Sequence, residues 1–140
     1  MNVPQPPHAL TNNTLRYREE DIDESIVGYV RSSAGVLRKA PAFLIGTLDG
    51  NIISIGKARE LDLEIMALEP GEGATFDFGT GRPERSIGKA VFEWKQSDNS
   101  IYAPLTVTCD VCENSAVGLV LGRPFIEARA GRTRRGSMYG

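Results

Sequence analysis

Short strand-forming runs, separated by turn sequences at intervals of roughly 8–15 residues, constrain this chain more than any other feature. The runs that we expect to form strands are residues 25–31, 41–45, 51–54, 74–78, 86–94, 101–109 and 117–122. Fifteen glycines are spread over the chain, and we find no solenoid-type repeat. This spacing predicts a mainly β domain in the form of a small closed barrel.

Two short helices are expected beside the strands. Ser54 is a good N-cap for a brief helix with Ala58 and Leu61 facing inward, and this helix must end before Pro70. Residues 123–130 suit one or two helical turns, because Pro124 falls at an early position where a missing N–H does no harm.

The chain length of 140 residues fits one domain. We expect a disordered N-terminal arm over residues 1–24, the barrel domain over 25–130 and a basic tail over 131–140. The net charge of −2 argues against a nucleic-acid or membrane surface covering the whole domain. The first residues show no signal-peptide pattern and no apolar run approaches the ~20 residues of a membrane span, so we expect an intracellular protein.

The order of several segments resembles that of retroviral-type aspartic proteases, including those of long-terminal-repeat retrotransposons. The resemblance covers about residues 26–128. The matching segments are a lead-in strand at 42–44, an apolar segment at 51–54, a short helix at 58–63, a flap-like hairpin at 76–88 with Gly79, Gly81 and Gly88, and a terminal Leu-Val-Leu-Gly-Arg-Pro-Phe-Ile block at 119–126. The resemblance implies an acid-protease-like β-barrel and a homodimer with one catalytic aspartate per subunit.

The resemblance places the catalytic aspartate at Ile45, the hydroxyl residue at Gly46 and the glycine at Thr47. The motif's second, structural aspartate falls on Asp49, and its ion-pair partner falls on Arg123. Aspartic proteases need two carboxylates that share one proton, and an isoleucine can neither take nor give a proton. We therefore predict a domain without protease activity that acts as an interaction or dimerisation module, with a homodimer mate or another protein as partner.

One alternative is an active homodimeric aspartic endopeptidase that uses Asp49 and takes a peptide in its cleft. It requires a catalytic motif shifted to Asp49-Gly50, which puts Asn51 where the motif needs glycine. A weaker alternative is nucleic-acid binding through the tail, where Arg132, Arg134 and Arg135 follow Arg129. We expect that tail to be a solvated end, and we expect no membrane partner.

Cys109 and Cys112 have a spacing found in zinc and redox sites. The single histidine, His8, falls in the expected arm, so a tetrahedral site lacks ligands. We expect two ordinary thiols, no metal and no cofactor. Trp94 and Tyr102 are expected to be exposed and to pair across a hairpin.

Overall fold

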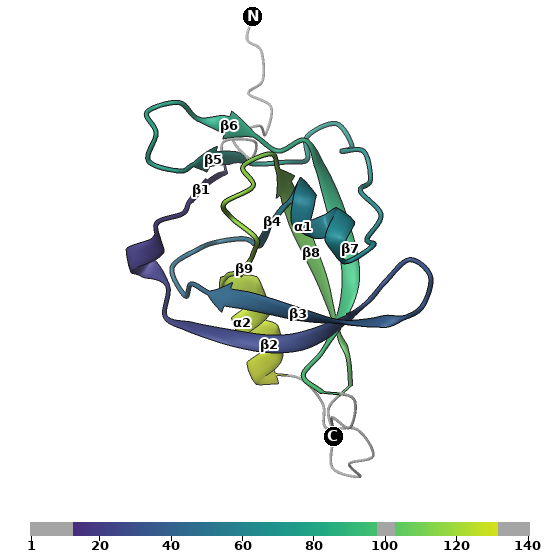
Figure 1. Cartoon of the computed structure of the whole chain (residues 1–140). Helices are drawn as coiled ribbons and strands as arrows, with labels where there is room; N and C mark the ends of the chain where they lie inside the picture. Colours follow the sequence, from purple (N-terminus) through teal and green to yellow (C-terminus); the bar gives the residue numbers. More distant parts are fainter. Residues whose placement is uncertain (1–12, 98–102, 132–140) are drawn as a thin grey trace, which may run out of the picture.

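Six strands close into a barrel in the order β2-β3-β9-β4-β8-β7 (Figure 1). The computed structural model describes residues 13–97 and 103–131. The barrel strands are β2 Glu24–Arg31, β3 Leu37–Leu44, β4 Ile52–Ser54, β7 Gly88–Lys95, β8 Leu105–Cys112 and β9 Leu119–Leu121. The pairs β3–β9 and β4–β8 are parallel and the other pairs are antiparallel. The expected mainly β, closed barrel is confirmed.

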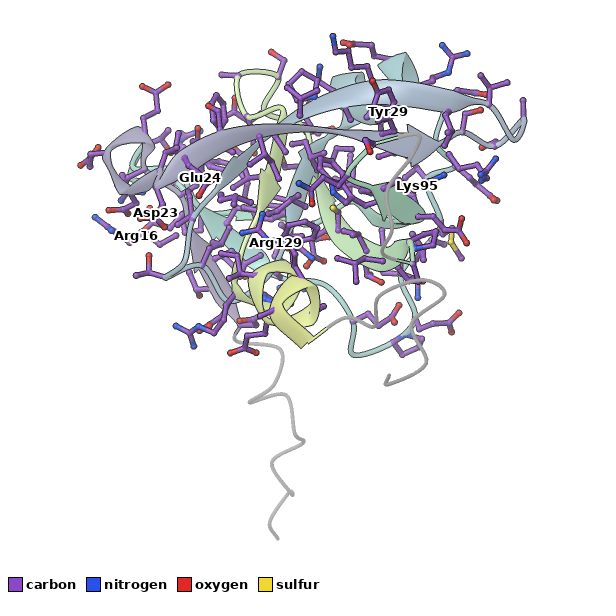
Figure 2. The ribbon with its side chains drawn as sticks, turned by 90° about the horizontal axis from the view of Figure 1, so that it is seen from below. Arg16, Asp23, Glu24, Tyr29, Lys95 and Arg129 are labelled. Atoms are coloured by element: carbon purple, nitrogen blue, oxygen red, sulfur yellow. The ribbon has the colours of Figure 1, made fainter. Side chains whose placement is uncertain are left out.

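Alternation of side chains explains the long barrel strands. In β3, Ala40, Ala42 and Leu44 are buried, whereas Pro41 and Phe43 face outward. A strand places successive side chains on opposite faces, so every second residue enters the core. β2 and β7 complete the closure at Tyr29 and Lys95, which Figure 2 shows at the same end of the barrel.

A second, three-stranded sheet lies over one end of the barrel (Figure 1). Its strands are β1 Thr14–Arg16, β5 Thr75–Asp77 and β6 Glu84–Arg85, in the order β1-β5-β6. β1 is parallel to β5, and β5 and β6 form an antiparallel hairpin. Ten buried residues fill the space between this sheet and the barrel, and we call them the second apolar cluster: Leu15, Tyr17, Ile45, Leu48, Ile52, Ala74, Phe76, Cys112, Val117 and Val120.

The expectation of a disordered arm as far as residue 24 is wrong for its second half. Residues 14–24 contain β1, the 3-10 helix η2 Glu19–Asp21 and the first residue of β2. Leu15 is fully buried although Thr14 and Arg16 beside it are exposed. The partner strand of β1 is about sixty positions further along the chain, so no local pattern shows this burial. Residues 1–12 lie outside the described part of the chain.

Two helices cover the barrel as expected. In α1, Ile55–Glu60, the Ser54 hydroxyl accepts a hydrogen bond from the Lys57 N–H at 3.1 Å. α2, Arg123–Gly131, buries Phe125, whose ring meets Trp94 edge-on with centroids 5.6 Å apart. Neither helix is long and apolar enough to cross a membrane, a statement that covers only the described residues.

Trp94 is only 2% exposed, so its expected surface position is wrong. It ends an alternating set of inward residues on β7 and packs against Gly28 of β2, where any Cβ would overlap the indole ring. Tyr102 lies outside the described residues, and the register places Leu105 opposite Trp94.

Candidate functional site

The loop formed by residues 45–51 lies at the centre of the candidate site. It joins β3 to β4, but β9 lies between these two strands, so the loop crosses the end of β9. The Ile45 N–H donates to the Leu121 carbonyl at 3.0 Å, and the Arg123 N–H donates to the Leu48 carbonyl at 2.7 Å. Backbone hydrogen bonds therefore tie both halves of the loop to the segment that leaves β9.

Asn51 and Gly122 form a further contact between the loop and this segment. The Asn51 Oδ1 accepts from the Gly122 N–H at 2.9 Å, and its Nδ2 donates to the Thr108 carbonyl at 3.0 Å. A Cβ at position 122 would overlap the carbonyl oxygens of Gly50 and Leu48. The sequence reasoning gave Asn51 no role, although an amide directly before the buried Ile-Ile pair of β4 was a usable signal.

The structure brings Asp49 and Arg123 together, as the resemblance implied. The Arg123 Nη1 lies 2.8 Å from the Asp49 Oδ1. Their side chains are 50% and 61% exposed, respectively, and ion pairs in water contribute at most about 1 kcal/mol. The pair fixes the direction of the loop, whereas Asn51 and the backbone supply most of the attachment.

Ile45, at the predicted catalytic position, is fully buried in the second apolar cluster. β1 and β5 contribute the Leu15 and Phe76 side chains to the same cluster. Thr47 is exposed and contributes no carboxylate. The position where a dyad would need an ionisable group therefore holds a buried apolar side chain.

A carboxylate does contact the loop, but it comes from another segment. The Asp23 Oδ2 accepts a hydrogen bond from the Gly46 N–H at 2.7 Å. Asp23 is exposed and directly precedes β2, at the edge of the molecule seen in Figure 2. Sequence analysis missed this residue because it is distant in sequence from the loop and lies in an acidic run.

The flap-like glycines divide into two groups. Gly79 and Gly81 have φ of +82° and +83° and form the turn between β5 and β6, where the left-handed region favours glycine. Gly88 lies in β7 instead, where a Cβ would come within 2.8 Å of Ile65 and 2.9 Å of the Met66 carbonyl oxygen. Only the first two therefore shape the hairpin.

The two cysteines do not face one another. Cys109 points into the barrel core and Cys112 into the second apolar cluster, because residues three apart on one strand lie on opposite faces. Burial raises the pKa of the Cys109 thiol well above its ordinary value and that of Cys112 to about 11. Both thiols are protonated at neutral pH, and among the described residues no cluster of three His, Cys, Asp or Glu could hold a metal.

A hollow of about 340 Å³ with a mixed polar and apolar lining lies beside the loop, between β8 and α2. Asp49, Asn51, Thr108 and Asp110 line it together with Phe125. Partial burial raises the pKa of the Asp110 carboxyl, although the Ser86 hydroxyl donates to it at 3.1 Å. The fold therefore opposes ionisation of the Asp110 carboxyl.

Of the arginines near the C-terminus, Arg129 lies on α2 with its guanidinium 5.6 Å from the centre of the Phe125 ring (Figure 2). Arg132, Arg134 and Arg135 lie outside the described residues.

These features define a small mainly β protein with a closed, six-stranded mixed barrel. Neither a scan against protein-family models nor a search of curated proteins finds a match for the chain. The functional assignment therefore depends on the geometry of the 45–51 loop and its surroundings.

Proposed function

We propose that this chain is a retropepsin-like domain that does not cleave peptides and serves as an intracellular interaction or dimerisation module, derived from a retroelement protease. The order of its parts supports the family: a loop after an apolar strand, a short helix, a glycine-bearing hairpin, and a Gly-Arg segment that enters the last helix. The 2.8 Å contact between Asp49 and Arg123 supports the same alignment.

The observation that supports the loss of activity best is the burial of Ile45. An aspartic protease holds a water molecule between two carboxylates that share a proton. Here the corresponding side chain is apolar and fully buried in the same cluster as Leu15 and Phe76, so it offers neither a proton acceptor nor a surface open to water. The Asp49 carboxylate is paired with Arg123 instead.

An exposed apolar surface on β2 and β3 supports an interaction role. Val27 and Phe43 are 50% and 38% exposed, and Pro41 lies directly opposite Val27 in the register. Contiguous exposed apolar side chains are typical of protein-binding surfaces. A homodimer mate or another protein is the partner class that we propose.

A peptide-cleavage assay at mildly acidic pH, with and without pepstatin, tests the proposed loss of activity. We expect no pepstatin-sensitive cleavage from the native chain. We expect no change with Asp49→Asn, which removes the carboxylate of the loop, or with Asp23→Asn, which removes the carboxylate that accepts from the loop's Gly46 N–H. Pepstatin-sensitive cleavage abolished by Asp49→Asn would instead establish the active endopeptidase. Sedimentation of the same sample measures whether the chain is a dimer.

A further inference from the structure

The edge of β5 holds a short segment of the same chain. Thr14–Arg16 pairs in parallel with Thr75–Asp77, and within the described part of the chain β5 is the only strand that β1 adjoins. The Thr75 N–H donates to the Asn13 carbonyl at 2.9 Å, and the Tyr17 N–H donates to the Asp77 carbonyl at 3.0 Å. Backbone pairing of this kind accepts any extended strand, so side chains must supply the selectivity.

Leu15 supplies the apolar part of that selectivity. It is fully buried between the hairpin and the loop, with both methyl groups about 3.0–3.1 Å from where a Cβ of Gly50 would lie. The missing side chain at Gly50 therefore makes room for this leucine. Thr14 and Arg16 on either side face solvent, so the groove recognises one apolar residue within an otherwise polar strand.

Arg18 and Tyr17 supply the remaining contacts to the hairpin. The Arg18 Nη1 donates to the Asp77 carbonyl at 2.8 Å, and its Nη2 lies 3.1 Å from the Asp77 Oδ1. The guanidinium lies against Gly79, where a Cβ would approach it to 3.1 Å. The Tyr17 ring meets Phe78 edge-on. Together these contacts define a groove for an extended strand with an apolar residue, an aromatic two positions later and an arginine directly after it.

We propose that this groove is a strand-exchange site, in which β1 of one copy of the chain binds the β5 edge of a second copy. The five residues 19–23 lie between the exchanged segment and β2 and contain only η2 as regular structure, so β1 can leave without disturbing the barrel ladder. The segment 13–18 of a second copy matches the groove in every contact, and exchange of an identical element is a low-cost route to dimers. This inference deepens the proposed interaction role by naming the partner and the contact, and it does not depend on the absence of cleavage.

Disulfide trapping between full-length chains tests the exchange. Thr14 and Thr75 are register partners, so Thr14→Cys in one chain and Thr75→Cys in another can bond only when β1 of the first lies on β5 of the second. The two natural thiols are buried and do not compete. We expect the mixed and oxidised chains to give a covalent heterodimer on a non-reducing gel.

Three controls make the outcome decisive. A chain with both Thr14→Cys and Thr75→Cys must form a disulfide between positions 14 and 75, within one chain or between two chains, which checks the register. As a mismatched partner, a chain with Ser33→Cys, in the exposed turn between β2 and β3, is mixed with the Thr14→Cys chain in place of the Thr75→Cys chain. This mixture should give no heterodimer above background. Adding Leu15→Asp to the Thr14→Cys chain should lower the heterodimer yield at least about tenfold, because the groove would bury a charge.

An internal disulfide in the double variant, with no heterodimer above the Ser33→Cys background, would show that β1 binds only its own chain and would overturn the proposal. A double variant that forms no disulfide between positions 14 and 75, either within one chain or between two, would overturn it as well, because the parallel register would then be wrong. Neither outcome affects the result of the cleavage assay, so this proposal and the proposed loss of protease activity are tested independently.

Discussion

Gly28 leaves room for the single tryptophan, Trp94, where any other residue at this position of β2 would place a side chain. A Cβ at this position would overlap the six-membered ring of Trp94, which also packs edge-on against Phe125. Overpacking of a filled core costs roughly 1–3 kcal/mol. We therefore expect Gly28→Ala to lower the free energy of unfolding by about that amount and to change the Trp94 fluorescence of the folded state.

Gly56→Ala is the matched control for this change. Gly56 lies within α1, and a Cβ there meets no atom within 4 Å. Alanine is the better helix former by about 1 kcal/mol, so this variant should be as stable as the native chain or slightly more stable. Urea denaturation followed by tryptophan emission measures both variants, and equal losses in the two would contradict the steric explanation.

Asn51 is a second residue whose role is visible only in three dimensions. Its side-chain amide donates a hydrogen bond to the Thr108 carbonyl and accepts one from the Gly122 N–H. Asn51→Asp keeps the shape but removes the donor and places a charge near a carbonyl oxygen, so we expect a loss of about 2 kcal/mol in unfolding free energy. Chemical denaturation measures it, with Asp49→Asn on the exposed side of the same loop as the control, for which a loss of similar size would contradict this assignment.

At the scale of elements, the crossing of the 45–51 loop over β9 depends on backbone proximity more than on charge. Gly122→Ala would force the loop away from its carbonyl contacts, and we expect a loss of more than about 3 kcal/mol, since no flexible side chain can yield. Arg123→Ala removes only a half-exposed ion pair and should cost at most about 1 kcal/mol. Thermal unfolding of the two variants measures the difference, and the reverse order would make the ion pair the principal attachment.

The elements that the sequence revealed are those with local periodicity. The residues alone show the alternation along β3 and β7, the Ser54 cap, and the apolar runs of β4 and β9. Each strand expected from the sequence corresponds to a strand of the structure. β1 and β6 were missed because β1 has one buried residue between exposed neighbours and β6 has none, so neither shows an apolar pattern. The burial of Trp94 was missed because the register that turns it inward is set by pairing with β2 and β8.

For the candidate site, the sequence placed Asp49 beside Arg123 because the spacing of a known motif could be followed. It could not show that Leu15 is buried in the same cluster as Ile45, or that Asp23 reaches Gly46. Both associations join segments that are separated by more than twenty residues. Long-range packing of this kind has no signature in a single sequence.

At the scale of the whole molecule, two carboxylates give opposite pH dependences of stability. Burial raises the pKa of Asp110, so the folded state holds its proton more tightly than the unfolded state. The protonated Asp110 carboxyl therefore adds to the stability of the fold below the ordinary carboxyl pKa of about 4. This stabilisation is lost as the pH rises through the raised pKa of the folded state. We expect Asp110→Asn to raise the Tm at pH 7, since the ionised group is then the penalised form.

Asp77 provides the comparison with the opposite sign. The hydrogen bond from the Gly79 N–H lowers the pKa of its carboxyl most, and Arg18 lowers it further. The ionised carboxylate therefore stabilises the fold above the ordinary pKa, and this stabilisation is lost as the pH falls through the lowered pKa. Asp77→Asn should therefore lower the Tm at pH 7 and have less effect at pH values near 3. A series of melting curves from pH 3 to pH 8 measures both variants, and shifts of the same sign at pH 7 would contradict the assignment.

The position of β9 between β3 and β4 also bears on how the protein is made. A ribosome delivers β3 and β4 long before residues 119–121 emerge, and until then both strands present edges that no neighbour covers. Closure must wait for nearly the whole chain, which makes formation of long-range contacts slow. A nascent chain stalled before residue 119 should therefore be recognised by chaperones and cut by proteases, whereas one released a few turns of α2 later should resist both.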